Sequence, residues 1–275
     1  MNLISEIQAD RAWLESLRHD IHAHPELAYE ETRTAGIVSD HLQQWGIEVS
    51  TGLAGTGVVG TLSNGSGPRI GLRADMDALP IHEANEFDYR SRHDGKMHAC
   101  GHDGHTTMLR GAAKYLAQHR SFAGTIDFIF QPAEEAAGGA KRMIDEGLFD
   151  QFPVDAVFGM HNWPGLEVGK FAVRTGAMMA SLDCFDIVIE GTGTHGALPH
   201  KGVDPVVAAA QVVTALQSIV SRNIDPLSVG IVSVTQIHAG DAYNIIPGRV
   251  DLAGGVRSFD PEVRKRLLQR VEEVA

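Results

Sequence analysis

The sequence has 275 residues, of which 43% are hydrophobic and 21% are charged, a composition typical of a globular protein rather than of a disordered chain. Its formal net charge of -12 at pH 7, without any lysine- and arginine-rich run, argues against nucleic acid or an anionic membrane surface as the main partner and favours a small molecule. The N-terminal stretch has no unbroken apolar segment, which predicts neither a signal peptide nor a membrane span and indicates a cytoplasmic protein.

Up to about Met178, predicted helices alternate with predicted strands. Apolar residues at three- and four-residue intervals predict amphipathic helices over residues 4–24 and 31–45. Short β-branched or leucine-rich runs bounded by Gly, Ser and Pro predict strands. These strands span 58–62, 69–75, 125–131 and 156–161, and further helices are expected over 104–118 and 139–146. This order is typical of an α/β domain with a mostly parallel sheet and helices on both faces.

The pattern changes after residue 178. Strand, helix, strand, strand and helix follow one another over residues 182–191, 204–222, 229–239, 249–258 and 261–274. This order predicts a small α+β unit of ferredoxin-like type over residues 179–275, separate from a first domain over 1–178. The two cysteines stand far apart in different contexts, so a disulfide framework is not expected. Cys184, flanked by Leu182 and Phe185, is expected to be a small core residue.

A cysteine and several histidines gather in the run MHACGHDGH, residues 97–105, between a predicted strand and the next helix. Parallel α/β sheets place their sites in loops at the carboxyl ends of the strands. Cys100 and His102 can converge there on one or two first-row metal ions, with Gly101 and Gly104 allowing a tight backbone. The alternative is a solvated histidine-rich loop with a buried structural cysteine.

Carboxylates and a further histidine follow two later strands. Glu134 and Glu135 come directly after the strand TIDFIFQ, where one could bind a metal while the other handles protons. A pair of acidic residues that begins a helix is the alternative. His161 ends the next apolar run. Because ligand-type residues follow three successive strands, the metal interpretation is favoured.

Several motifs together resemble a family of metal-dependent amidohydrolases that includes hippurate hydrolase, bacterial N-acyl-amino-acid amidohydrolases and plant hydrolases of indole-acetyl amino acids. The motifs are HAHPEL, LRADMDALP, MHACGHDGHTTM, FQPAEEAAGGA and GMHNWP. The resemblance runs from about Leu17 to Phe259. It implies a metal-dependent hydrolase that cleaves the linear amide bond of N-acyl amino acids, such as N-acetyl or benzoyl derivatives.

The resemblance also implies a dinuclear metal site in the first domain. Its ligands would be Cys100, His102, Glu135 and His161, and Glu134 would act as general base and acid. Zinc or manganese is expected first, with cobalt or nickel as alternatives, because this mixed ligand set does not select one metal.

Asp75 and Asp77 fall in an acidic motif that supports the ligands in related enzymes, and Asp77 would orient a ligand without binding metal itself. The alternative is that both merely cap a strand end. In HAHPEL, His22, His24 and Glu26 are interpreted as helix-end structure without a catalytic role.

The second domain would be a lid that forms a homodimer. By the resemblance, His195 in GTGTHGALPH steadies the tetrahedral intermediate, a task suited to an imidazole that donates a hydrogen bond. Asn244 and Arg257 would bind the substrate carboxylate, for which the planar fork of arginine is suited. Without the resemblance they would be interpreted as a turn asparagine and a surface arginine.

One departure from the family pattern is expected to matter. Related chains return from the lid to complete the main sheet and supply a last histidine ligand, a segment that this sequence lacks. This gap keeps open the alternative of a truncated, non-catalytic metal- or ligand-binding remnant. Two further alternatives are a dipeptidase that uses the same site and, more weakly, a thiol redox protein that uses Cys100.

Overall fold

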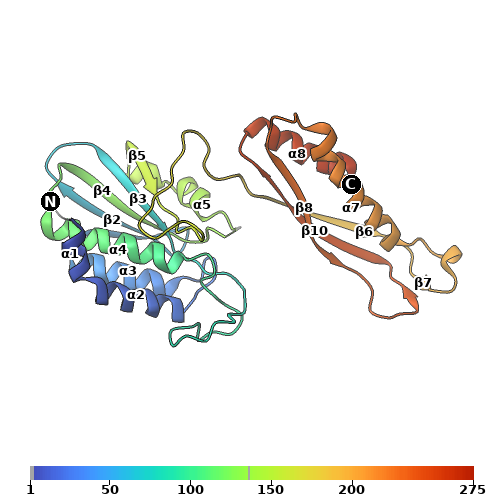
Figure 1. Cartoon of the computed structure of the whole chain (residues 1–275), viewed down its shortest axis with the longest axis horizontal. Coiled ribbons are helices and arrows are strands. Elements are labelled where there is room, and N and C mark those ends of the chain that lie inside the picture. The colour runs from blue at the N-terminus through green and yellow to red at the C-terminus, as the bar shows by residue number, and fades with distance from the viewer. Residues whose placement is uncertain (1–2, 136) are drawn as a thin grey trace. The chain divides into compact units, whose positions relative to one another are not determined.

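The computed structural model describes residues 3–135 and 137–275 (Figure 1). The chain divides into two compact units, residues 1–166 and 167–275, called unit 1 and unit 2 below. The sequence pattern places the boundary near Met178 instead, because the stretch before it contains no regular secondary structure that the pattern could assign to either side.

Unit 1 is a five-stranded sheet with helices. Its helices are α1 (Leu3–Ala9), α2 (Arg11–Ala23), α3 (Thr32–Gln44), α4 (His102–His119), α5 (Gly139–Asp145) and α6 (Leu148–Gln151). Its strands are β1 (Glu48–Leu53), β2 (Gly57–Asn64), β3 (Arg69–Asp75), β4 (Gly124–Gln131) and β5 (Ala156–Gly159), in the order β1-β2-β4-β3-β5.

The sheet is mixed, so the expectation of a mostly parallel sheet holds for β3, β4 and β5 but not for β1 and β2. β3 runs parallel to both β4 and β5, but β2 is antiparallel to β4 and to β1. β1, which the sequence pattern does not predict, joins β2 through a tight turn at Ala54 and Gly55, both with positive φ. Strands joined by so short a turn can pair only in the antiparallel direction.

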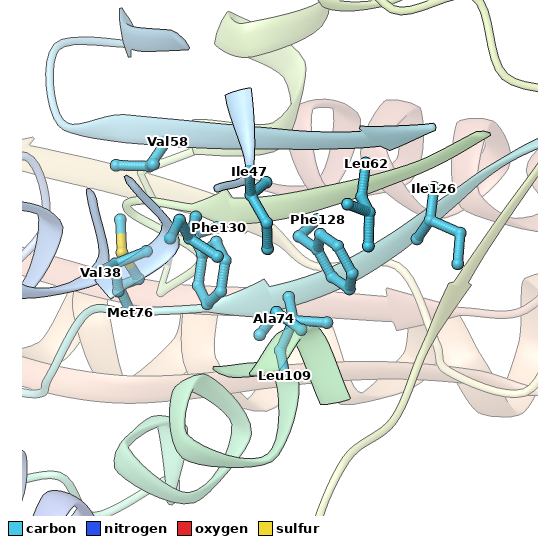
Figure 2. Close-up of a cluster of buried hydrophobic side chains, with 12 residues drawn as sticks. Val38, Ile47, Val58, Leu62, Ala74, Met76, Leu109, Ile126, Phe128 and Phe130 are labelled. Carbon is cyan, nitrogen blue, oxygen red and sulfur yellow. The ribbon is translucent and has the colours of Figure 1, made fainter. Parts of the chain in front are cut away.

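Helices cover both faces of this sheet. Phe128 and Phe130 of β4 point towards α3 and α4, where they pack in one cluster with Val38 and Leu109 (Figure 2). Ile129, between them, points the other way and joins Met143 and Leu148 of α5 and α6. This alternation is the two-residue period of a β-strand buried on both sides. Each fully buried side chain of this size contributes about 1.5–3 kcal/mol to folding.

The parallel strands β3, β4 and β5 end at the same edge of the sheet. Asp75 pairs with Gln131 at the ends of β3 and β4, and Arg73 pairs with Gly159 at the end of β5. The segments that follow these strands therefore begin next to one another. They carry the residues that the sequence predicts to bind metal.

Unit 2 has a three-stranded antiparallel sheet, order β6-β10-β8, and a two-stranded one, β7-β9. Its elements are β6 (Asp183–Glu190), β7 (Thr194–His195), a 3-10 turn (Pro199–Lys201), α7 (Pro205–Asn223), β8 (Gly230–His238), β9 (Ile245–Ile246), β10 (Arg249–Ser258) and α8 (Pro261–Val274). Asp204 and Asp260 cap α7 and α8 by accepting hydrogen bonds from first-turn N–H groups, each directly before a proline.

Only one face of the larger sheet in unit 2 is covered by helices. Leu216 of α7 and Leu267 of α8 pack with Val232 and Val256 of the sheet. Along β6, exposed and less exposed residues alternate, and Phe185 lies on the helix side. Its neighbour Cys184 therefore points to the other face and is exposed, so the prediction that it is a core residue is wrong.

Among the described helices of both units, none combines the length and apolar character needed to cross a membrane.

Candidate metal and hydrolytic site

The loop before α4 brings Cys100 and His102 to the edge where β3 ends. Gly101 stands at the N-cap of α4 with φ of 86°. A Cβ atom there would lie 2.3 Å from the side-chain nitrogen of Asn162, so only glycine fits both the left-handed backbone and the close approach. His102 begins the helix and is 1% exposed.

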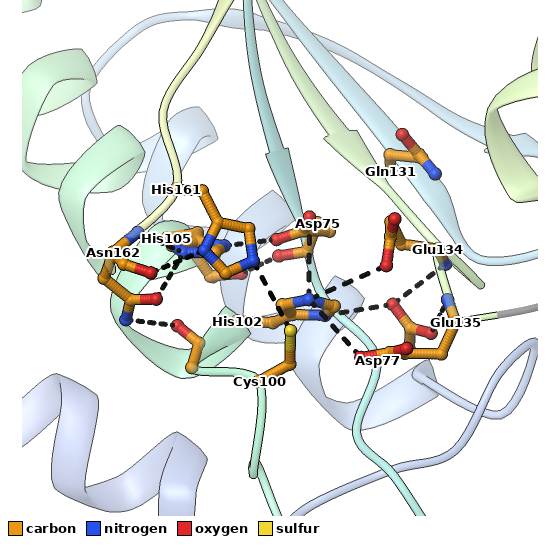
Figure 3. Close-up of polar contacts among 12 residues, drawn as sticks. Asp75, Asp77, Cys100, His102, His105, Gln131, Glu134, Glu135, His161 and Asn162 are labelled. Carbon is orange, nitrogen blue, oxygen red and sulfur yellow. Dashed lines mark hydrogen bonds and ion pairs between the residues drawn. The ribbon is translucent and has the colours of Figure 1, made fainter. Parts of the chain in front are cut away.

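Residues from three segments meet around His102 (Figure 3). Its Nε2 atom lies 3.9 Å from a carboxylate oxygen of Glu134 and 3.9 Å from one of Glu135. Ligand atoms of Cys100, His102 and His161 lie within 4.8 Å of one another, and Cys100 Sγ is 3.4 Å from His161 Nε2. The five residues predicted for the metal site are thus neighbours.

The chemistry of this cluster suits divalent cations. His102 Nε2 and Glu135 Oε1 are both buried, both able to accept, and neither has a hydrogen-bond partner. Leaving such atoms unpaired in a protein interior is costly. A cation between them would satisfy both, and the surrounding thiol, imidazole and carboxylate groups are ligands for first-row metals.

Without a cation the cluster holds its protons tightly. Burial raises the pKa of the Cys100 thiol to about 12, and the charges of Glu135 and Glu134 add to this effect. Burial likewise raises the pKa of Glu134, reinforced by the charges of Glu135 and Asp75. Burial opposes a charged His102, but its hydrogen bond with Asp77 and the nearby carboxylates raise its pKa overall.

Asp77 holds several parts of the cluster in place. One oxygen lies 3.3 Å from His102 Nδ1 and accepts from the backbone N–H of Glu134 at 3.0 Å, and the other accepts from the N–H of Glu135 at 2.9 Å. If Nδ1 carries the proton donated to Asp77, Nε2 is left free to face the carboxylates. Asp77 thus contacts a histidine and the backbone of both glutamates.

Asp75 has different partners. Its carboxylate contacts His105 Nδ1 at 2.6 Å and Arg73 at 2.7 Å, while His102 Nε2 is 3.7 Å away. His105 is 2% exposed, and the N–H of Asn162 donates to its Nε2 at 3.0 Å. His105 is not among the site residues predicted from the sequence. Its spacing of three residues from His102 could have indicated it, because residues three apart share one face of a helix.

A second buried network lies beside the loop. His22 of α2 contacts Asp103 at 2.9 Å through Nδ1 and Glu83 at 3.0 Å through Nε2. Asp103 also accepts from Arg18 at 3.1 Å. Because Asp103 directly follows His102, this network ties α2 to the first turn of α4. His22 of the motif HAHPEL therefore helps to hold the loop that carries His102, in addition to ending α2. The local sequence pattern could not predict this contact.

In unit 2, a two-stranded ladder holds His195 beside the segment that contains Asn244. His195 pairs with Ile245, and the N–H of Gly196 donates to the carbonyl of Asn244 at 2.7 Å. The N–H of Ala197 donates to His195 Nδ1 at 3.1 Å. A neutral His195 must then carry its proton on Nε2, where it can donate to a ligand.

Arg257 lies on β10 of the same unit, where its guanidinium runs back over Gly255. A Cβ atom at Gly255 would be 3.3 Å from Nη1 of Arg257, tighter than ordinary packing allows. The small residue therefore leaves room for the guanidinium beside the strand. That Nη1 donates to the carbonyl of Val256 at 3.3 Å.

Comparison with known proteins decides the family. Residues 71–266 match the peptidase family M20/M25/M40. The chain belongs to this family. Its M20 relatives include hippurate hydrolase of Campylobacter jejuni, 48% identical over 275 residues, which covers 100% of this chain and 72% of the relative. The family expected from the motifs is thereby confirmed.

Further M20 relatives agree. The N-acyl-L-amino acid amidohydrolase of Geobacillus stearothermophilus is 46% identical, covering 99% of this chain and 73% of the relative. A solved M20 structure, a dinuclear metal binding peptidase from Bacillus subtilis, superposes with a TM-score of 0.75 at 38% identity and covers 97% of this chain and 69% of that one. Across the curated relatives compared, the chain spans 59% to 73% of their length.

Proposed function

We propose that the chain hydrolyses the amide bond of N-acyl amino acids, using two divalent metal ions held in unit 1. The observation that carries this proposal is the convergence of Cys100, Glu134, Glu135 and His161 around His102, with two buried acceptor atoms left unpaired. M20 relatives with matching names at 46% and 48% identity support the same reaction.

Four residues would hold the ions: Cys100, His102, Glu135 and His161. When bound, the ions would polarise the amide carbonyl and acidify a water molecule. Zinc or manganese suits the mixed sulfur, nitrogen and oxygen donors. Asp77 would keep His102 oriented through Nδ1, because its carboxylate already contacts that atom.

Glu134 would move the proton. As the water attacks the amide carbonyl, the carboxylate removes its proton, and the resulting acid then protonates the nitrogen that leaves. Burial and neighbouring carboxylates raise the pKa of Glu134, which brings it closer to neutral pH and suits both steps. Its side chain is 43% exposed, so a substrate could reach it.

Unit 2 would supply substrate contacts. His195 would donate from Nε2 to the oxyanion, since Nδ1 already accepts from the backbone of Ala197. Arg257 and Asn244 would bind the substrate carboxylate, the arginine by a two-point contact. We further propose that unit 2 acts as a lid and pairs with that of a second copy, and that the homodimer works in the cytoplasm. Both cysteines are free thiols, as a reducing compartment favours.

The test is amine release from N-acetyl and N-benzoyl amino acids and from unblocked dipeptides, by metal-free chain and by chain loaded with zinc or manganese. Metal-dependent release from the acylated substrates supports the proposal. Preference for dipeptides would favour a dipeptidase. A folded chain that binds two ions but releases no amine from any substrate would contradict the proposal and favour a non-catalytic remnant.

A further inference from the structure

The turn that carries Glu134 and Glu135 has an unusual backbone. It follows β4, and its central residue, Ala133, has φ of 52°. Left-handed backbone is unfavourable for a residue with a Cβ atom, so contacts around the turn must impose it. On the far side of the turn, the N–H of Gly139 donates to the carbonyl of Ala133 at 2.8 Å.

Buried carboxylates hold three consecutive N–H groups of this turn, those of Ala133, Glu134 and Glu135. Asp77 accepts from Glu134 and Glu135, and Glu31 accepts from Ala133 at 2.8 Å. Three consecutive backbone donors are therefore fixed from two directions. The contact from Glu31 is the one that reaches the left-handed residue itself.

Glu31 makes this contact from the other end of unit 1's sequence. It is 0% exposed and stands directly before α3. The same oxygen that accepts from Ala133 also accepts from the N–H of Tyr29 at 3.1 Å, and the other accepts from the hydroxyl of Thr56 at 2.6 Å. Tyr29, also left-handed at φ 64°, donates its hydroxyl to the carbonyl of Ala137 at 2.7 Å.

The carboxylate of Glu31 does not cap the helix that it precedes. Glu26 caps α3 instead, accepting from the N–H groups of Arg33 and Thr34 at 2.8 Å each and from the Thr34 hydroxyl at 2.9 Å. The side chain of Glu31 makes no capping hydrogen bond. A fully buried carboxylate is expensive, and here its hydrogen bonds converge on the turn and on the segments beside it.

We propose that Glu31 is a positioning residue that imposes the left-handed turn at Ala133 and thereby aims the carboxylates of Glu134 and Glu135 at His102. This role rests on the proposed function for its effect on turnover, but not for its effect on the turn. Catalytic groups need placement to within a fraction of an ångström, which a fixed backbone provides.

Three variants test this role. Glu31→Ala removes the contacts. Glu31→Gln keeps an oxygen for Ala133 and Tyr29 and offers its amide to the Thr56 hydroxyl. Glu26→Ala is the matched control, because it removes a nearby carboxylate of similar bonding that does not contact the turn.

The first measurement is amide hydrogen exchange at Ala133, Glu134 and Glu135 in the metal-free proteins. Exchange should be about tenfold faster in Glu31→Ala, as expected for a lost buried hydrogen bond, and should match the wild type in Glu31→Gln and Glu26→Ala. Unchanged exchange in Glu31→Ala, or the same acceleration in Glu26→Ala, would overturn the proposal. If Glu31→Ala does not fold, Thr56→Val replaces it, because it removes one donor to Glu31. A smaller acceleration of exchange in Thr56→Val would support the proposal, and unchanged exchange would overturn it.

The second measurement is zinc affinity by competition with a chelator, together with kcat and KM. Glu31→Ala should weaken zinc binding and lower kcat about 100-fold with KM nearly unchanged, and Glu31→Gln should restore both to within a few-fold. Equal loss in Glu31→Ala and Glu31→Gln would count against positioning. A wild type that binds zinc but never turns over refutes the proposed function alone, since exchange and zinc affinity still report on Glu31.

Discussion

The two units hold their candidate functional residues in different ways. In unit 1, His102, Asp75 and Asp77 are buried, both aspartates lie within 4 Å of His102, and the backbone of the two glutamates is tied to Asp77. In unit 2, His195 on the short strand β7 and Asn244 in the turn before β9 are exposed and are held mainly through backbone contacts.

The two arrangements suit different tasks. Buried hydrogen bonds to charged groups keep side chains in one geometry, as a metal site requires. Exposed residues on a short ladder keep their donors free for a ligand. We therefore expect substitutions in unit 1 to affect metal binding and chemistry, and substitutions in unit 2 to affect substrate binding with the metal site intact.

The largest expected effect is that of Glu134→Gln in unit 1. Removal of a general base should lower kcat about 1,000-fold, because the amide can neither take nor return the proton. Metal content, measured by atomic emission, should stay at the wild-type value. The exposed Glu86→Gln is the control and should be fully active. A wild-type kcat in Glu134→Gln would show that Glu134 is not the general base.

Arg257→Lys in unit 2 should weaken substrate binding and leave metal binding unchanged. Loss of the planar fork should lower kcat/KM about 10- to 100-fold, mostly through KM, with zinc affinity unchanged. Arg249→Lys is a matched control on the same strand, since Arg249 pairs with exposed Asp251. Steady-state kinetics over a series of substrate concentrations measures both. Weaker zinc binding in Arg257→Lys would contradict the expectation that substitutions in unit 2 leave the metal site intact.

Metal affinity of unit 1 should rise with pH. In the metal-free protein the pKa of Cys100 is raised to about 12 and that of His102 is raised as well, so both hold protons that a metal must displace. For each proton displaced, affinity should fall about tenfold per pH unit below the relevant pKa. Calorimetry in buffers of different ionisation enthalpy counts the protons released. Equal affinity at pH 6 and pH 8 would contradict this account.

The smallest effect is expected at Cys184. Because this thiol is exposed on the open face of the unit 2 sheet, Cys184→Ser should change the free energy of unfolding by less than about 0.5 kcal/mol. In metal-loaded protein, iodoacetamide should modify Cys184 and spare Cys100, as peptide mass spectrometry would show. Faster modification of Cys100 would mean that no metal protects it.

Much of the candidate site could be predicted because its residues follow strands. Glu134 and His161 each stand just beyond an apolar strand, Cys100 lies in the loop between β3 and α4, and parallel strands end at one edge. The proline after each capping aspartate likewise marks the starts of α7 and α8 locally. These features depend on residues close together along the chain, so the local sequence pattern is enough to predict them.

Other features of the fold and the site depend on contacts between residues far apart in the sequence. The pairing of β2 with β4, which makes the sheet mixed, and the open face that exposes Cys184 depend on which elements become neighbours. Glu31 reaches Ala133 across 102 positions, and His105 meets Asp75 across 30. Such contacts leave no local periodicity, because a hydrogen bond requires that two groups meet in space and not that they stand near each other along the chain.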